Sequence, residues 1–208
     1  MVSERRRQEK KDRIIRAAAR VFALKGYAGT LVADIAAEAG IGKGTLYQYF
    51  SSKEDLLFAV FYWYMDKIGA STMVGVSTLT QTASDKLTAL GNAVLQACVE
   101  MAEMYGLVIE FWAASTSSKI EGRFKEVFRQ GYGQYRELVA ALITEGIERN
   151  EFRKDVDPHL LAATLVGTWD ALGLQAWFDR DFAPIEANES FMAVFIAGLK
   201  SDRCHQSV

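Results

Sequence analysis

Residues 26–56, GYAGTLVADIAAEAGIGKGTLYQYFSSKEDL, hold two short amphipathic segments separated by a glycine-containing turn. The first, about 31–39, is predicted to be a helix with Thr30 as a plausible N-cap, and Gly40 suits the left-handed residue that ends such a helix. The second covers about 43–49, and its roughly seven residues would not remain helical in isolation. Two short helices joined in this way form a helix–turn–helix, in which the second helix enters the major groove of DNA.

The segments that flank this unit are also predicted to be helical. Upstream, residues 4–25 place Ile14, Ala18 and Phe22 on one face, and Gly26 follows as a C-terminal stop. Cationic side chains crowd the same segment, at Arg5, Arg6, Arg7, Lys10, Lys11, Arg13, Arg16 and Arg20. Downstream, helices are predicted from Ser52 to about residue 70 and at about 84–103, 106–116, 120–150, 158–178 and 187–200. The chain has two prolines in 208 residues, which permits long helices, and the predicted fold class is all-α.

Residues 12–56 resemble the DNA-binding domain of the TetR family of bacterial transcription regulators. The matching features, at fixed spacing and without a gap, are Ile14 to Phe22, Gly26-Tyr27, Thr30, Ile35-Ala36, Ala39-Gly40-Ile41, Lys43 to Tyr47, Phe50 and Ser52 to Leu56. The resemblance implies an N-terminal three-helix helix–turn–helix DNA-binding domain over residues 1–56. It further implies a larger helical ligand-binding and dimerisation domain over residues 57–208.

The resemblance and the side-chain chemistry together predict a set of DNA-contacting residues. They are Thr30, Lys43, Gly44, Thr45, Tyr47, Gln48, Tyr49 and Lys53. The Gln48 amide can pair with adenine N6 and N7 in the major groove. Thr45 suits phosphates, and Lys43 can reach either a phosphate or a guanine edge. Lys53, at the start of the next helix, also suits a phosphate. Packing on the three-helix core stays open as an alternative for Tyr47 and for Tyr49. For the N-terminal cations the resemblance implies an arm in the minor groove, and a solvated charged face is the alternative.

Formal charge is divided unequally along the chain. The whole chain has 24 Lys+Arg and 26 Asp+Glu, a net charge of −2, which taken alone argues against a basic nucleic-acid binder. Residues 1–56 hold 11 Lys+Arg and 7 Asp+Glu, a net of +4, so the remainder holds 13 and 19, a net of −6. A basic N-terminal segment on an acidic body can neutralise DNA phosphates while the body is kept off the DNA.

The body is predicted to bind a small molecule and to have no catalytic role. Its histidines, His159 and His205, lie in neither an HExxH nor a Glu-x-x-His pattern, so we expect no metal site, no cofactor and no enzyme activity. The effector is expected to be apolar or aromatic, because the candidate pocket residues are bulky and soft. These candidates are Met101, Met104, Tyr105, Phe111, Trp112, Phe128, Tyr132 and Trp169. Plain core packing is the alternative for each of them. Glu110 fits a solvated helix face or, less well, a selector of cationic ligands.

The last two predicted helices are apolar on most sides, which favours burial on most sides. The resemblance implies that they form a four-helix interface in a homodimer. The predicted interface residues are Leu161, Thr164, Leu165, Thr168, Leu172, Phe191, Phe195 and Leu199. A monomer in which these helices only complete the core is the alternative.

Together these features predict a ligand-responsive repressor that binds palindromic double-stranded DNA as a homodimer and is released by a small-molecule effector. An effector-independent regulator or activator is one alternative, and a helical small-molecule or lipid-binding protein or enzyme is another. The N-terminus has no apolar signal-peptide core, and the sequence has no run of 18 apolar residues. We therefore expect a cytoplasmic protein without a membrane partner.

Overall fold

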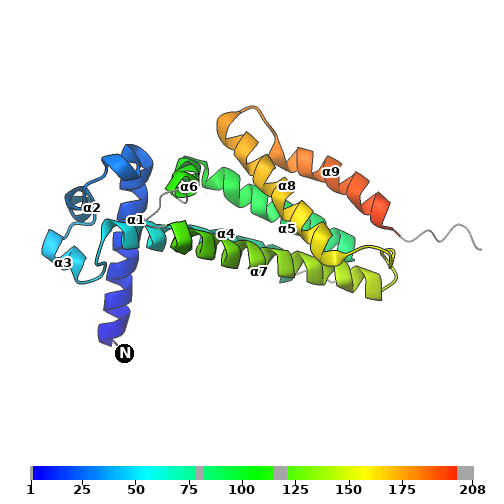
Figure 1. Ribbon diagram of the computed structural model, residues 1–208, viewed down its shortest axis with the longest axis horizontal. Helices are drawn as coiled ribbons and strands as arrows, with labels where there is room; N and C mark the ends of the chain where they lie inside the picture. The colour runs from blue at the N-terminus through cyan, green and yellow to red at the C-terminus, as the bar shows by residue number, and fades with distance from the viewer. Residues whose placement is uncertain (1, 78–81, 115–120, 201–208) are drawn as a thin grey trace, which may run out of the picture. The chain divides into compact units, whose positions relative to one another are not determined.

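The computed structural model describes residues 2–77, 82–114 and 121–200, and helices dominate this part of the chain (Figure 1). They are α1 (Val2–Gly29), α2 (Val32–Glu38), α3 (Lys43–Tyr47), α4 (Lys53–Ser77), α5 (Ala83–Glu100), α6 (Ala102–Ala114), α7 (Glu121–Glu148), α8 (Pro158–Phe178) and α9 (Pro184–Leu199). The all-α prediction is confirmed. The break predicted at Gly26 is also present, since this residue has φ 70° and ψ 162° inside α1.

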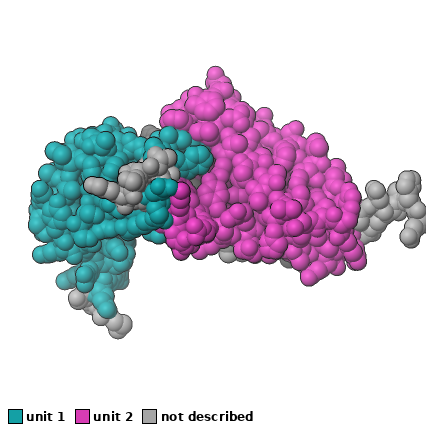
Figure 2. Space-filling model, viewed as in Figure 1, with its two compact units in different colours: residues 1–67, 103–124 teal, residues 68–102, 125–208 magenta. Residues whose placement is uncertain are grey.

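The chain forms two compact units, which Figure 2 shows in teal and magenta. The first contains residues 1–67 and 103–124, and the second contains residues 68–102 and 125–208. Helices α4 and α7 each contribute residues to both units. The first unit therefore contains, besides the helix–turn–helix, a large part of α6 and the first turn of α7.

The first unit has a core in two parts. In the helix–turn–helix part, Ile14 and Phe22 of α1, Ile35 of α2 and Leu46 of α3 are buried, so the two short helices are anchored to α1. Next to α4, aromatic rings form the second part. The Phe58 and Phe124 centroids are 4.4 Å apart, the Phe61 and Phe111 centroids 4.8 Å, and the Phe111 and Phe124 centroids 5.9 Å. This aromatic cluster holds α6 and α7 to α4.

The second unit buries a core between α5, α7, α8 and α9. Trp169 of α8 is buried in it, and its indole Nε1–H donates to Oδ1 of Asn188 on α9 at 2.9 Å. Asn188 Nδ2 in turn donates to Oδ1 of Asn92 on α5 at 2.8 Å. A Cβ at Gly91 would lie 2.6 Å from Trp169 Nε1, so glycine is required where α5 approaches this network. The three helices are thereby fixed by paired polar groups as well as by apolar contact.

Helix starts in this unit follow local capping rules. The Asp157 carboxylate accepts from the backbone N–H of His159 at 2.8 Å and of Leu160 at 3.2 Å, and Pro158 occupies the first helical position. The start of α8 that Asp157-Pro158 predicts is thus confirmed. At the start of α5 the backbone N–H of Ala83 donates to the Glu151 carboxylate at 2.8 Å.

Candidate functional site

Helices α2 and α3 are joined by a turn with the predicted glycine geometry. Gly40 has φ 64°, as expected for the left-handed residue that ends α2. Gly42 is the N-cap of α3 and is extended, with φ −71° and ψ 147°. Helix α3 spans Lys43–Tyr47, two residues shorter than the predicted segment, and the buried Leu46 fixes it to the core.

The outer face of α3 presents most of the predicted DNA contacts. Lys43, Gly44, Tyr47 and Gln48 are exposed, while Thr45 and Tyr49 are half-buried. Tyr47 is 46% exposed, so its ring is not part of the core, and the Lys43 Nζ lies 6.0 Å from its centroid. A Cβ at Gly44 would meet nothing within 4 Å, which leaves the backbone there open to a partner. Lys43, Gly44, Tyr47 and Gln48 are therefore accessible to a partner.

Thr30 does not have the predicted role. The N-cap of α2 is Leu31, whose backbone N–H donates to Asp34 Oδ2 at 3.0 Å. The Thr30 side chain is fully buried, and its hydroxyl donates to the Gly26 carbonyl at 2.7 Å. The capping prediction for Thr30 is wrong because the hydroxyl turns back to α1 one residue before the cap. That hydroxyl also lies away from the surface on which a phosphate would bind.

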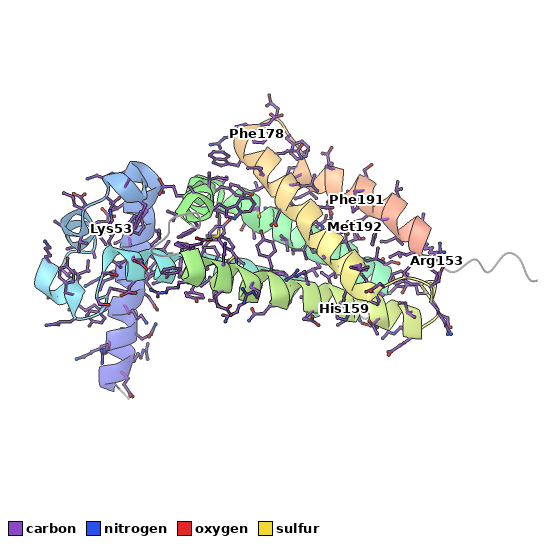
Figure 3. The ribbon with its side chains drawn as sticks, viewed as in Figure 1. Lys53, Arg153, His159, Phe178, Phe191 and Met192 are labelled. Atoms are coloured by element: carbon purple, nitrogen blue, oxygen red, sulfur yellow. The ribbon has the colours of Figure 1, made fainter. Side chains whose placement is uncertain are left out.

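Lys53 joins α4 to the end of α1 (Figure 3). Its Nζ donates to the carbonyl of Tyr27 at 2.7 Å and to that of Thr30 at 3.0 Å, and it lies 4.4 Å from the Tyr27 ring centroid. Two of its three N–H donors are thus committed to backbone carbonyls. The prediction of a phosphate contact did not include this structural role of Lys53, because the role depends on α4 lying next to the end of α1 in the fold.

Glu110 of α6 binds the same break in α1. Its Oε2 accepts the backbone N–H of Tyr27 at 2.5 Å, and a Cβ at Gly26 would lie 2.7 Å from its Oε1. Neither of the roles considered for Glu110 from the sequence, a solvated face or a ligand selector, matches this position. The local sequence could not predict this contact, because Tyr27, whose N–H Glu110 binds, lies 83 positions earlier in the chain.

Arg123 makes a comparable link between α7 and α4. Its guanidinium donates to Asp55 Oδ1 at 2.8 Å and lies 3.9 Å from the Phe58 ring centroid. The hydrogen bond from Ser51, followed by that from Arg123, lowers the pKa of the Asp55 carboxyl below its ordinary value of 3.8. The start of α4 therefore contacts two other helices: Asp55 binds Arg123 of α7, and Lys53 binds the backbone of α1.

The predicted ligand residues do not all gather in one place. Phe111 is fully buried in the aromatic cluster of the first unit, and Trp169 is buried in the hydrogen-bond network of the second, so for these two the core-packing alternative holds. Trp112, next to Phe111, is 47% exposed. Half-buried candidates are divided between the units, with Tyr105 in the first and Met101, Phe128 and Tyr132 in the second. The Met104 side chain lies outside the described residues.

A half-buried polar cluster in the second unit was not predicted. Asp170 of α8 accepts a hydrogen bond from the Tyr132 side chain, and burial raises the pKa of its carboxyl above the ordinary value. Burial, together with the charge of Asp170, raises the pKa of the Cys98 thiol to about 12. Tyr132, like Trp169, is thus a predicted ligand residue that has a polar partner in the second unit, and the raised pKa disfavours the thiolate form of Cys98.

One open pocket on α7 and α8 has a volume of about 330 Å³. It is lined by Glu137, Ala140, Ala141, Thr144, Glu145, Glu148 and His159, and none of the predicted ligand residues lines it. Within residues 2–77, 82–114 and 121–200, no group of three His, Cys, Asp or Glu side chains could hold a metal ion. Over the same ranges no helix combines the length and apolar character needed to cross a membrane.

The predicted dimer residues divide between core and surface. Leu165 and Leu199 are buried in the second unit itself, which corrects their assignment to a surface that a second copy could contact. Thr164 is exposed, and Leu161, Thr168, Leu172, Phe191 and Phe195 are half-buried. Among the exposed apolar or small residues on α8 and α9 are Leu160, Ala163, Gly167, Ala171, Phe178, Ala193, Val194 and Ala197. We call these eight residues the α8–α9 face.

Comparison with known proteins agrees with this architecture. Residues 14–60 match the family described as bacterial regulatory proteins, tetR family, and residues 111–192 match the tetracyclin repressor-like C-terminal domain. The fatty acid metabolism regulator protein of Bacillus subtilis is 24% identical over 202 residues, covering 94% of this chain and 98% of the relative. The HTH-type transcriptional repressor KstR2 of Mycolicibacterium smegmatis is 26% identical over 194 residues, covering 91% and 90%.

Solved structures share the fold over nearly the whole chain. A TetR transcriptional regulator from Chloroflexus aurantiacus superposes with a TM-score of 0.77 and 28% identity, covering 94% of this chain and 98% of its own. A transcriptional regulator from Saccharomonospora viridis, solved in complex with choline, has a TM-score of 0.75 and 22% identity over 93% and 99%. Both domain families and these relatives lead to one assignment: the chain belongs to the TetR family of bacterial transcriptional regulators.

Proposed function

We propose that this protein is a homodimeric repressor that binds palindromic operator DNA through α3 and releases it when a small molecule binds the helical body. In this proposal residues 1–56 are the DNA-binding domain, residues 57–208 bind effector and partner, and the protein acts in the cytoplasm without catalysing a reaction. The observation that carries the proposal is the polar surface of α3, held by a buried core and open at Gly44.

Gln48, the C-cap of α3, is the proposed reader of bases. Its exposed side chain ends in an amide that matches the donor and acceptor pair of adenine in the major groove. Lys43, Thr45 and Tyr47 are proposed to bind phosphates and so to fix the register of the helix on the DNA. A helix of five residues contacts few bases, so a second protomer is needed for specificity.

Dimerisation is proposed to use the α8–α9 face. Leu160 is 68% exposed and Val194 is 74% exposed, which leaves large apolar side chains in water in a single protomer. Neighbouring small residues such as Gly167 and Ala171 would allow a second copy to approach closely. A two-fold dimer would place its two α3 helices about one DNA turn apart, roughly 34–36 Å, and so read a palindrome.

The effector is proposed to act on the contacts that hold α1 to α4 and α6. Glu110 and Lys53 both bind the backbone just after the break in α1, at Tyr27 N–H and Tyr27 C=O, so a small movement of α6 or α4 would change the orientation of the DNA-binding helices. An apolar or aromatic effector fits the half-buried Phe128 and Tyr132, whose ring centroids are 6.3 Å apart. The fatty acid regulator and the choline complex among the relatives support a small organic ligand. A coupling of about 1–3 kcal/mol would suffice for release.

Selection of operators from a pool of random duplexes, followed by fluorescence anisotropy, tests the proposal. We expect a palindrome to be enriched, and the double variant Lys43→Ala/Gln48→Ala to lose its preference for that palindrome over arbitrary DNA. Sedimentation at micromolar concentration should show a dimer. Enrichment of no sequence, or a double variant that discriminates as well as the unaltered protein, would overturn the DNA-binding proposal.

A further inference from the structure

A carboxylate and two aromatic rings from different helices of the second unit lie close together. Asp170 of α8 accepts a hydrogen bond from the Tyr132 side chain of α7. One turn before Tyr132, the Phe128 ring has its centroid 6.3 Å from the Tyr132 centroid. Burial, followed by the charge of nearby Asp170, raises the pKa of the Cys98 thiol on α5. We call Cys98, Phe128, Tyr132 and Asp170 the Asp170 cluster.

The Asp170 cluster is within reach of solvent but is only partly hydrated. All four side chains are half-buried, and Tyr132 also packs against the buried core of the second unit. Burial is the larger of two influences on the Asp170 pKa and raises it, while the hydrogen bond from Tyr132 lowers it. An ionised carboxylate at this position has lost part of its hydration. A cation that binds beside it therefore restores part of the lost stabilisation.

The charges around the Asp170 cluster also favour a cation. On α7, Lys125 is exposed to solvent, and Arg136 donates its Nε–H to the backbone carbonyl of Tyr132 at 3.3 Å. The Cys98 thiol, with a pKa of about 12, is neutral near pH 7. Residues 57–208 hold 13 Lys+Arg and 19 Asp+Glu, so the body that carries the cluster is acidic. An acidic body attracts cations toward its surface.

The aromatic rings select the same sign of charge. The faces of Phe128 and Tyr132 carry negative electrostatic potential, which attracts a cation and repels an anion. The Tyr132 hydroxyl donates to Asp170 and so stabilises the ionised carboxylate, not a protonated one that would donate to a ligand oxygen. A carboxylate beside two such rings suits an ammonium group whose carbon substituents contact the rings.

We infer that the Asp170 cluster binds the positively charged nitrogen of an organic cation whose remaining part is apolar or aromatic. Asp170 pairs with the charge, the rings of Phe128 and Tyr132 contact the carbon atoms next to the nitrogen, and the Tyr132 hydroxyl orients the carboxylate. The inference rests on the proposed function and deepens it, because the effector proposed there as apolar or aromatic also carries a positive charge.

Three probes with the same apolar tail and different head groups test the inference. Octyltrimethylammonium, octanol and octanoate are titrated into the full chain, without DNA, in a calorimeter near pH 7 and below the concentrations at which they form micelles. We expect the cation to bind about tenfold or more tightly than octanol, because a charge pair in a partly dehydrated site outweighs its desolvation. Octanoate should bind more weakly than octanol.

An isosteric variant and a charge-matched control locate the site. Asp170→Asn removes the charge and keeps an acceptor for Tyr132, so the cation and octanol should bind with affinities within about threefold of each other. Glu137→Gln removes one negative charge from the open pocket that Glu145 and Glu148 also line, and should leave the preference for the cation unchanged. Circular dichroism should show both variants folded, since Glu137 is exposed and burial disfavours an ionised carboxylate at Asp170.

Phe128→Leu gives a second reading that does not depend on Asp170→Asn. It keeps apolar bulk and removes one ring face, so it should weaken binding of octyltrimethylammonium more than binding of octanol. Equal weakening of the two probes would show that the ring does not contact the charge, and would overturn its role in the inference.

Other outcomes would overturn the inference as a whole. These are no binding of any probe, equal binding of the cation and octanol, tighter binding of octanoate, and a preference for the cation that survives in Asp170→Asn. A preference lost in Glu137→Gln would place the cation in the open pocket instead.

The titrations separate this inference from the proposed function because they contain no DNA. A protein that enriches no operator but prefers the cation would refute the repressor proposal and retain the cation site. A protein that binds an operator but has no preference for the cation would do the reverse.

Discussion

Replacing Gly26 with alanine tests how closely α6 holds the break in α1. The backbone at Gly26, with φ 70° and ψ 162°, lies in a region that is essentially restricted to glycine and costs other residues about 1–3 kcal/mol. The new Cβ would lie 2.7 Å from Glu110 Oε1, so the carboxylate must withdraw and weaken its bond to Tyr27 N–H. Because the carboxylate ends a flexible side chain, this adds only about 1 kcal/mol. We expect Gly26→Ala to destabilise the fold by about 2–4 kcal/mol.

Two other glycines serve as controls. Gly40 also has a positive φ, 64°, but a Cβ there would meet nothing within 4 Å. Gly40→Ala should therefore lower stability only through backbone strain, by about 1–2 kcal/mol. Gly44 lies within α3 at an ordinary φ with open space around it, so Gly44→Ala should leave stability unchanged or slightly raised. The three substitutions thus separate backbone strain from contact with Glu110.

Thermal unfolding followed by circular dichroism measures the series. For a chain of this size about 3 kcal/mol corresponds to a fall in Tm of roughly 6–12 °C. In a Glu110→Ala background the cost of Gly26→Ala should be about 1 kcal/mol smaller, because no carboxylate remains to be displaced. If Gly26→Ala costs no more than Gly40→Ala, or costs the same with and without Glu110, the reasoning about this contact is refuted.

Three further outcomes are expected. Gly44→Ala, although stable, should weaken operator binding on the order of tenfold in anisotropy titrations, because its Cβ would stand where DNA approaches the backbone. The lowered pKa of Asp55 means that its carboxylate stabilises the fold above its ordinary pKa of 3.8 and that this contribution is lost as pH falls through the lower folded-state pKa. Urea unfolding at pH 6 and pH 3 should therefore show a smaller acid loss in Arg123→Gln than in the unaltered protein, and an equal loss would contradict the pairing. Val194→Arg on the α8–α9 face should convert dimer to monomer in sedimentation without lowering helix content, and an unchanged dimer would exclude this residue from the interface.

The sequence predicted features that depend on local rules. The left-handed Gly40, the stop at Gly26 and the start of α8 at Asp157-Pro158 follow from backbone and capping preferences within a few residues. The length of α4 could not be predicted from these local rules. It continues to Ser77 rather than to about residue 70, because helix ends in a Ser/Thr/Gly-rich stretch depend on packing more than on propensity.

Roles that depend on tertiary contact were missed. Lys53 was predicted to bind a phosphate because a cation at the start of a helix is well placed for an anion. Its ammonium instead binds backbone carbonyls 26 and 23 residues earlier in the chain. Glu110 binds a backbone N–H still more distant in sequence. Composition also failed to separate pocket from core. Phe111 and Trp112 are adjacent and chemically similar, but they point about 100° apart on α6, so one is buried and the other is exposed.

The α8–α9 face shows why the second half of the chain was the harder half to predict. A helix that is apolar on all sides has no polar stripe to show which face meets solvent. Its sequence therefore predicts burial, but not whether its own chain or a partner covers each face. Leu165 is covered by its own chain, whereas Leu160, on the same helix, is 68% exposed. On α9, Val194 is likewise 74% exposed. Because monomeric proteins rarely leave large apolar side chains uncovered in contiguous patches, these exposures are the physical reason for proposing that a second copy covers this face.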